Sequence, residues 1–420
     1  MRHPDQEKEM GSMEQFFYVG IDLDDENAVI SCYEQNKKEP ETFGMVAGSE
    51  VYQIPTVVTK KKGIGQWYIG DEARRAARAQ GGGSVGALLS LAAAEKAVVV
   101  DGEQYQGAEL LELFLRKLLR LAGGLGREKT PDALAICVEA LDRTLANLFM
   151  NLGQKLGIPA KQLLLLNRRE CFYYFVYHQN KELWLHDIML YDYRGTRMLC
   201  ERISRNRRTV PQMITISGQS REICGADPDA AFLRAAEETM KGHIVSAVYL
   251  VGDGFDGGWM KRSAAFCCRG RRAFVGKNLY SKGACYAAAV QKGREPWNYV
   301  YLGDNEMKLN VSLKVQNKRK EEFYSLLTAG ENWYEAAGEC EVILAGTPEI
   351  NFWLQLPGSR EAKVEKLRLS DLPKRPDKTT RLRITAKPLS DCTVQIRIKD
   401  LGFGELFAGS GKVWEYKMSL

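Results

Sequence analysis

Three glycine-bearing segments, in each of which an apolar strand runs into a tight turn with acidic residues, constrain the fold of this chain more than any other feature. They are YVGIDLDDENAVISCYE at residues 18–34, WLHDIMLYDYRGTRML at 184–199 and SAVYLVGDGFDGGWM at 246–260. In such turns, backbone N–H groups can bind a phosphate and carboxylates can hold its metal ion. The pattern therefore predicts an α/β domain built around strand–turn units.

The composition limits the number of domains and the classes of partner. A chain of 420 residues with 45% hydrophobic residues can form two or three domains with real cores. The net charge of +6 is small for this length, and short basic clusters at residues 60–62, 205–208 and 269–272 are interpreted as solvated surface. We therefore expect no nucleic-acid partner. No apolar run is long enough to span a bilayer, so we expect no membrane partner either.

The ten cysteines follow no metal-ligand spacing, which argues against a structural zinc site. Small buried thiols of this kind are typical of a reducing compartment. We therefore expect a cytoplasmic protein.

The periodicity of the apolar residues changes near Pro296. Before this residue, helix and strand patterns alternate, whereas MKLNVSLKV, EINFWLQL, RLRITA and TVQIRIKDL in the last part of the chain follow period two. We therefore predict a disordered leader at residues 1–14, an α/β domain at 15–295 and an antiparallel β-sandwich-like domain at 296–420. In the last domain we expect Phe403 and Phe407 to plug the sandwich, with a partner's groove as the alternative.

The order of the three segments resembles the first phosphate loop, second phosphate loop and adenosine loop of the actin, sugar-kinase and heat-shock-chaperone ATPase superfamily. The stretches IPTVVTKKKGIGQWYIGDEARRAA (54–77) and NLYSKGACYAAAV (278–290) resemble further parts of the chaperone ATPase domain. The whole chain resembles a bacterial family of actin-like proteins of unknown activity, with GDGF, RGRR, NLYSKGACYA and DLGFGELF as shared motifs. The resemblance implies a bilobal actin-like ATPase fold with a duplicated ribonuclease H-like core, and ATP or ADP with Mg²⁺ as the ligands of that fold.

Both phosphate loops depart from the superfamily pattern. The first normally reads D-L-G-T-T, but here Asp22 is followed by acids at residues 24–26, which would repel a triphosphate. The second keeps Asp192 and Gly195 but places Tyr193 and Arg194 between them. The adenosine loop keeps its glycines. We therefore expect a remodelled nucleotide cleft without ATP hydrolysis, and no catalytic residue is identified.

The residues expected to line this cleft come from all three loops. They are Asp22, Asp24, Asp25, Asp192, Arg194, Gly195, Gly252 and Gly254. Asp22 and Asp192 are candidates for holding a hydrated Mg²⁺, and the alternative is that turn N–H groups and a neighbouring arginine satisfy both acids. We also predict that Arg194 reaches the acids at 24–26 and occupies the space of a phosphate.

Three functions remain open. The first is a non-hydrolysing scaffold or partner-binding protein that needs no cofactor and binds a protein partner the sequence does not identify. The second is a nucleotide-binding ATPase or switch of chaperone type that uses ATP or ADP with Mg²⁺. The third is an NADP-binding or sugar-kinase-like enzyme, because residues 252–257 also read GxGxxG and Arg271 and Arg272 follow.

Overall fold

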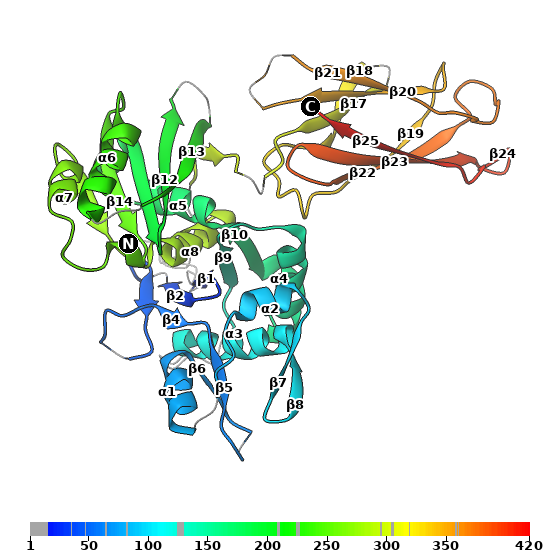
Figure 1. Cartoon of the computed structure of the whole chain (residues 1–420). Coiled ribbons are helices and arrows are strands. Elements are labelled where there is room, and N and C mark those ends of the chain that lie inside the picture. The colour runs from blue at the N-terminus through cyan, green and yellow to red at the C-terminus, as the bar shows by residue number, and fades with distance from the viewer. Residues whose placement is uncertain are drawn as a thin grey trace, which may run out of the picture. The chain divides into compact units, whose positions relative to one another are not determined.

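The computed structural model describes residues 16–420 except 35, 47, 64, 81–82, 124–129, 208–210, 224–226, 295, 304–305, 319, 358 and 360. The leader predicted at residues 1–14 lies outside the described residues. The chain divides into two compact units, Met1–Tyr299 (unit 1) and Val300–Leu420 (unit 2), whereas the sequence analysis placed the boundary between residues 295 and 296 (Figure 1). In the described part of the chain, no helix is both long and apolar enough to cross a membrane.

The first sheet of unit 1 has the order β3-β2-β1-β9-β10, with β4 as a further neighbour of β2. Strands β1, β2 and β3 are antiparallel, whereas β9 and β10 run parallel to β1. Because β1, β9 and β10 are buried along their whole length, they read as continuous apolar runs. The strands are β1 (Phe17–Leu23), β2 (Asn27–Glu34), β3 (Glu41–Phe43), β4 (Ile54–Pro55), β9 (Ala133–Val138) and β10 (Leu163–Asn167).

The second sheet of unit 1 repeats this topology. Read in the same direction as the first sheet, its order is β13-β12-β11-β14-β15, with β16 beside β13 at the edge. Strands β11, β12 and β13 are antiparallel, whereas β14 and β15 run parallel to β11. Strand β11 thus holds the place that β1 holds in the first sheet. The strands are β11 (Asp187–Arg194), β12 (Arg197–Asn206), β13 (Gln212–Glu222), β14 (Val245–Val251), β15 (Arg272–Val275) and β16 (Tyr299–Tyr301).

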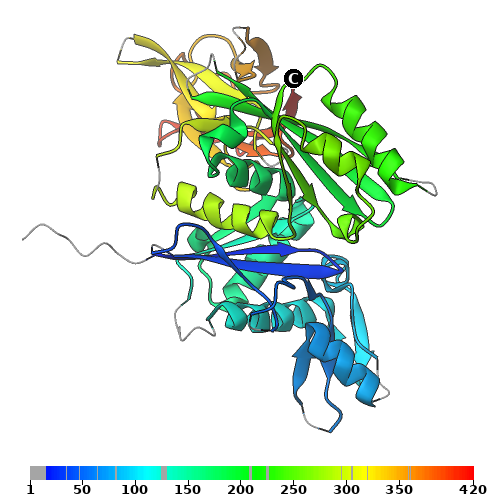
Figure 2. The same cartoon turned by 90° about the vertical axis from the view of Figure 1, so that its left-hand side faces the viewer.

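Two helices, α5 (Arg168–Tyr177) and α8 (Leu279–Gln291), pack against each other and join the two halves. Helix α8 follows the second sheet but lies along β1 and β2 of the first (Figure 2). Helix α5 follows the first sheet, and its Phe172 and Phe175 contact Tyr249 of the second. Helix α8 and strand β1 approach each other so closely that a Cβ at Gly20 of β1 would lie 2.2 Å from the Ser281 carbonyl oxygen of α8.

The remaining helices flank the sheets or extend the first half. Helix α6 packs its Phe232 against the second sheet beside α7, and α3 packs against α4 and β2. Pro55 lacks an N–H group, and the chain around it forms two short strands, β4 and β5. The other elements of unit 1 are β5 (Val58–Lys60), β6 (Trp67–Ile69), α1 (Gly70–Gln80), α2 (Leu88–Ala93), β7 (Ala97–Val100), β8 (Glu103–Gln106), α3 (Gly107–Gly123), α4 (Arg143–Leu156), α6 (Pro228–Met240) and α7 (Arg262–Cys267).

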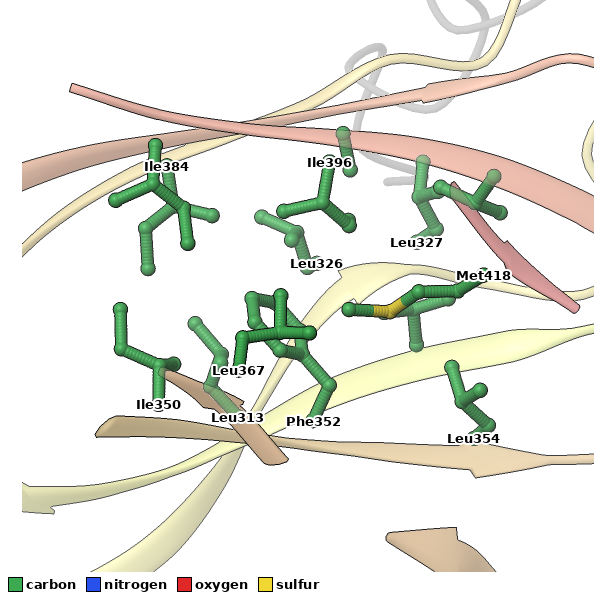
Figure 3. Close-up of a cluster of buried hydrophobic side chains, with 14 of the residues drawn as sticks. Leu313, Leu326, Leu327, Ile350, Phe352, Leu354, Leu367, Ile384, Ile396 and Met418 are labelled. Atoms are coloured by element: carbon green, nitrogen blue, oxygen red, sulfur yellow. The ribbon is translucent and has the colours of Figure 1, made fainter. Parts of the chain in front are cut away.

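Unit 2 contains two antiparallel sheets that face each other across a common apolar core (Figure 3). One has the order β18-β17-β20-β21, and the other has β19-β22-β23-β24 with β25 beside β23. Alternate residues point inward, as in β22, where Leu382, Ile384 and Ala386 are buried. The strands are β17 (Asn310–Asn317), β18 (Lys320–Leu327), β19 (Gly338–Ile343), β20 (Glu349–Gln355), β21 (Lys363–Arg368), β22 (Arg381–Pro388), β23 (Thr393–Phe403), β24 (Phe407–Ala408) and β25 (Val413–Ser419).

The prediction that two phenylalanines plug this sandwich is wrong. Phe403 and Phe407 are only half-buried, pair with each other between β23 and β24, and are not part of the core cluster. Along β23 the buried residues alternate from Val394 to Gly402, so Phe403 lies on the face of the strand that points away from the core.

Candidate functional site

The turn between β1 and β2 is held together by Asp24. Its Oδ1 accepts hydrogen bonds from the backbone N–H groups of Glu26, at 2.9 Å, and Asn27, at 2.8 Å. An aspartate in this position commonly closes a turn on itself. Its Oδ2 therefore remains available for partners outside the turn. Asp22 lies at the buried end of β1 and is 6% exposed.

Arg168 is the first residue of α5 and binds both of these acids. A capping box between Asn167 and Glu170 fixes the start of the helix. Arg168 Nε donates to Asp22 Oδ1 at 2.9 Å, and Nη2 donates to Asp24 Oδ2 at 2.7 Å. The side chain is 8% exposed. Such bonds between a guanidinium and carboxylates are the strong, charge-assisted kind.

Arg194, at the end of β11, reaches the same carboxylate from the other half of unit 1. Its Nη1 lies 2.7 Å from Asp24 Oδ2, and its Nε donates to Asp192 Oδ1 at 2.8 Å. The predicted contact between Arg194 and the acidic turn is therefore present, with Asp24 as the partner.

Tyr280 of α8 completes the cluster. Its hydroxyl donates to Asp192 Oδ2 at 2.8 Å, and the Arg168 guanidinium lies over its ring, 5.3 Å from the centroid. A cation over an aromatic face is attracted to it, more strongly when both are shielded from water. We call the whole set the clamp, which comprises Asp22, Asp24, Arg168, Asp192, Arg194 and Tyr280.

The charges of the clamp stabilise one another. Burial by itself raises the pKa of Asp24, but Arg168, the Asn27 N–H and Arg194 outweigh it, so this pKa lies below its ordinary value of 3.8. Burial by itself lowers the pKa of Arg168, yet Asp22 and the other acids hold it well above its ordinary value. The Asp24 carboxylate and the Arg168 guanidinium therefore stay charged although the protein shields them from water.

Little space remains beside the clamp. The pocket lined by Asp22, Asp24, Arg194, Gly252 and Tyr280 has about 20 Å³ in which the centre of a water molecule can sit. A volume of about 10–15 Å³ on this measure holds one water. In this conformation the pocket therefore has no room for a nucleotide phosphate chain.

Asp22 and Asp192 do not offer free oxygens to a cation. Both oxygens of Asp22 face Arg168, at 2.9 and 3.4 Å, and those of Asp192 are bound by Arg194 and Tyr280. Among the described residues, no group of three or more His, Cys, Asp or Glu side chains is arranged to hold a metal ion. The geometry favours the alternative in which a neighbouring arginine satisfies each acid.

Four of the residues expected in the cleft are not members of the clamp, namely Asp25, Gly195, Gly252 and Gly254. Asp25 turns away and accepts hydrogen bonds from the Ser90 backbone N–H, at 2.9 Å, and from the Ser90 hydroxyl. It thereby caps α2, whose own N-cap residue, Ala87, has no side-chain acceptor. Gly195 has a φ of 57° and forms the exposed turn from β11 to β12.

Gly252 and Gly254 let the loop after β14 close onto β11. A Cβ at Gly252 would lie 2.2 Å from the Tyr193 carbonyl oxygen, and one at Gly254 would lie 2.4 Å from the Tyr193 ring. That ring is buried and packs against Phe255 and Trp259. The glycines of the predicted adenosine loop therefore make room for a tyrosine of the protein itself.

Sequence reasoning did not identify Arg168 and Tyr280 as site residues. The pattern Asn167-Arg168-Arg169-Glu170 was a usable signal, because a capping box at the end of a buried strand places its first helical residue at the edge of the sheet. Tyr280 carried no such signal, since its role depends on α8 lying on the opposite sheet.

Comparison with family models identifies the family of this chain. The model described as "Family of unknown function (DUF5716) C-terminal" matches residues 39–304, which is more than half of the sequence. The chain belongs to this family. In addition, "Domain of unknown function (DUF8552)" matches residues 306–420, which cover most of unit 2. A search of curated proteins found no match. Four residues of the clamp lie within the range matched by the DUF5716 model, whereas Asp22 and Asp24 precede it.

Proposed function

We propose that this DUF5716 protein is a non-hydrolysing scaffold or partner-binding protein, in which an actin-like cleft is closed by its own side chains. The observation that carries the proposal is the Asp24 carboxylate, which binds both Arg168 and Arg194. In a nucleotide-binding cleft, a phosphate group could occupy this position between two arginines, so the Asp24 carboxylate takes the place of a phosphate. Asp24 is attached to the chain and cannot be released by hydrolysis.

The actin-like part of the proposal is supported by the repeated strand order of unit 1. Asp22 and Asp192 lie near the ends of β1 and β11, the corresponding strands of the two sheets. The helices α5 and α8 cross between the halves, as a bilobal fold with a ligand between its lobes requires. The resemblance of the three loops to phosphate and adenosine loops agrees with this arrangement.

A nucleotide-dependent switch is the second candidate, and one observation favours it. Arg194 is about a third exposed, with 35% of its side chain accessible, so the Asp24–Arg194 contact lies near the mouth of the pocket. If the acidic turn withdrew, two arginines would face the pocket without their internal anion. A nucleotide phosphate could then compete with Asp24.

A thermal-shift titration of the full chain with ATP and ADP, with and without Mg²⁺, separates the two candidates. A specific ligand at a hundred times its Kd stabilises a protein by about 2.7 kcal/mol, which is readily detected. The scaffold proposal expects no shift in the wild type and no phosphate release above buffer. A Mg²⁺-dependent shift or steady phosphate release would contradict it and favour the switch.

The variant Asp24→Asn sharpens this experiment. Asparagine keeps the Oδ1 acceptor that closes the turn but removes the charge that satisfies the two arginines. If the internal anion is what closes the cleft, this variant should gain a shift with ATP or ADP that the wild type lacks. Asp25→Asn is the matched control, because Asp25 lies in the same turn but outside the clamp.

A further inference from the structure

A second pocket of unit 1 lies between the β5–β6 and β7–β8 hairpins, which project from the same end of the unit (Figure 1). It has about 240 Å³ in which the centre of a water molecule can sit, many times the space beside the clamp. The hairpins are tied together by Lys60, which binds Glu103 and Tyr105, and by the edge-to-face contact of Trp67 with Tyr105. The pocket is therefore a built feature of two connected hairpins. We call it the hairpin pocket.

One wall of the hairpin pocket is the edge of β5. Val58 and Val85 exchange both backbone hydrogen bonds, at 2.9 Å each, in an isolated antiparallel bridge. On the opposite edge of β5, Lys61 N–H bonds to the Gln66 carbonyl. Because backbone groups alternate along an antiparallel strand, Lys60 directs its N–H and C=O to the same side as Val58, into the pocket. Within the described residues, the pairing stops at Val85, so this edge can accept another strand.

A buried hydroxyl also points to a ligand. Thr59 is 3% exposed and lines the pocket, and its Oγ1 has no hydrogen-bond partner among the described residues. A buried hydroxyl without a partner is costly, so a position of this kind calls for an explanation. A ligand that supplies a donor or acceptor in the pocket would satisfy it.

The side chains around the pocket indicate the chemistry of that ligand. Val85 and Val99 are apolar, and Val99 is 72% exposed although it belongs to a strand. In this region Lys60, Lys61 and Lys62 outnumber the acids Asp101 and Glu103, which favours an acidic ligand. A free strand edge beside alternating apolar and basic positions is the arrangement that binds extended peptides by strand addition.

We propose that the hairpin pocket binds an extended peptide segment of a protein partner, which pairs with β5 at Lys60, packs an apolar side chain against Val85 and Val99, and directs an acidic side chain to Lys62. The site is separate from the clamp, and the proposal does not depend on the state of the cleft. Binding should therefore be the same in the clamp variant Arg194→Ala.

Phage-displayed random peptides, selected on the immobilised full chain, test the proposal. We expect enriched sequences in which apolar and acidic residues alternate. Synthetic versions of the enriched peptides are then measured by fluorescence anisotropy against the wild type and three variants. Val99→Asp should weaken binding at least tenfold, because it removes the apolar contact and adds a repelling charge. Val51→Asp, at a valine that is 65% exposed elsewhere in unit 1, should leave it unchanged.

Thr59→Val completes the test. It removes the hydroxyl at nearly constant volume, so it should weaken peptide binding severalfold without lowering the melting temperature. The proposal is overturned if no peptide is enriched over selection without the protein, or if the enriched sequences are basic. It is also overturned if Val99→Asp binds the peptides as the wild type does, or if Val51→Asp weakens binding as much as Val99→Asp.

Discussion

The turns that follow β1 and β11 occupy the same place in the two sheets of unit 1, yet their charges are opposite. Each follows an aspartate near the buried end of its strand, Asp22 in β1 and Asp192 in β11. Beyond it, the first turn places an acid, Asp24, where it faces the second half, and the second places Arg194. If both of these equivalent turns bound a phosphate, each would need backbone N–H groups or cationic side chains facing it. Complementary turns bind each other instead, and this is why we interpret the cleft as closed from within.

The comparison also shows that the two turns contribute unequally. Asp24 is the common partner of both arginines and also closes its own turn, whereas Arg194 binds one acid in each half, Asp24 and Asp192. Removing different members of the clamp should therefore lower the free energy of unfolding by different amounts, which can be ranked.

The largest effect is expected for Arg168→Ala. Its side chain is buried, and its loss would leave the buried Asp22 without its guanidinium partner. Breaking a buried ion pair from one side costs about 3–5 kcal/mol. Urea unfolding of the full chain measures this as a lower midpoint at unchanged slope. The control is Arg74→Ala, since Arg74 pairs with Asp71 at the surface, where such pairs contribute about 0–1 kcal/mol. Equal costs for the two variants would show that the clamp adds no stability.

A double-mutant cycle on Asp24→Asn and Arg194→Ala tests the contact between the two turns directly. Each single change should cost about 1.5–3 kcal/mol, the range for hydrogen bonds to charged groups, with Asp24→Asn the larger because it affects two arginines. The double variant should cost less than the sum, with a coupling energy of about 0.5–3 kcal/mol. Strictly additive costs would mean that the turns do not stabilise each other.

The acidic turn should also make the stability depend on pH. The pKa of Asp24 in the folded protein is below its ordinary value of 3.8, so below that value the unfolded chain binds the proton first. The stabilisation is therefore complete above the unfolded pKa and is lost as the pH falls through the folded one. We expect the stability difference between wild type and Asp24→Asn to be constant near neutral pH and to shrink below pH 3.8. A difference that stays constant through this acid range would contradict the assignment of the charge to Asp24.

The smallest effect is expected for Asp25→Ala, which separates the two roles of the acidic turn. Asp25 caps α2 and makes no contact with the clamp in the described structure, so its loss should cost about 0.5–2 kcal/mol, as other helix caps do. The coupling energy between residues 24 and 194 should be unchanged when the cycle is repeated in this variant. A changed coupling would mean that the turn acts as one unit.

The elements of the fold were largely predictable from the residues. The helix at 143–156 begins after Asp142, whose carboxylate caps Leu145 N–H at 2.8 Å, and is followed by Gly157 with a φ of 79°. Such signals act within one turn of a helix, so the sequence displays them directly. The period-two pattern after Pro296 likewise predicted strands β17, β20, β22 and β23, because alternate residues of each one enter the same core. The prediction for Phe403 was wrong, because this residue lies on the face of β23 opposite to Val394, Ile396 and Ile398.

The sequence by itself determined which residues form strands and turns, because these depend on neighbours only a few positions away. Its resemblance to two facing phosphate loops also predicted that the acidic turn and Arg194 would meet. Only the tertiary structure decided that Asp24 rather than Asp25 is the partner, and that Arg168 and Tyr280 belong to the same cluster. The contacts of Arg168 with Asp22 and of Arg194 with Asp24 join residues 146 and 170 positions apart. Such contacts exist because α5 and α8 cross between the two sheets, and no local pattern of residues specifies where crossing helices bring their side chains.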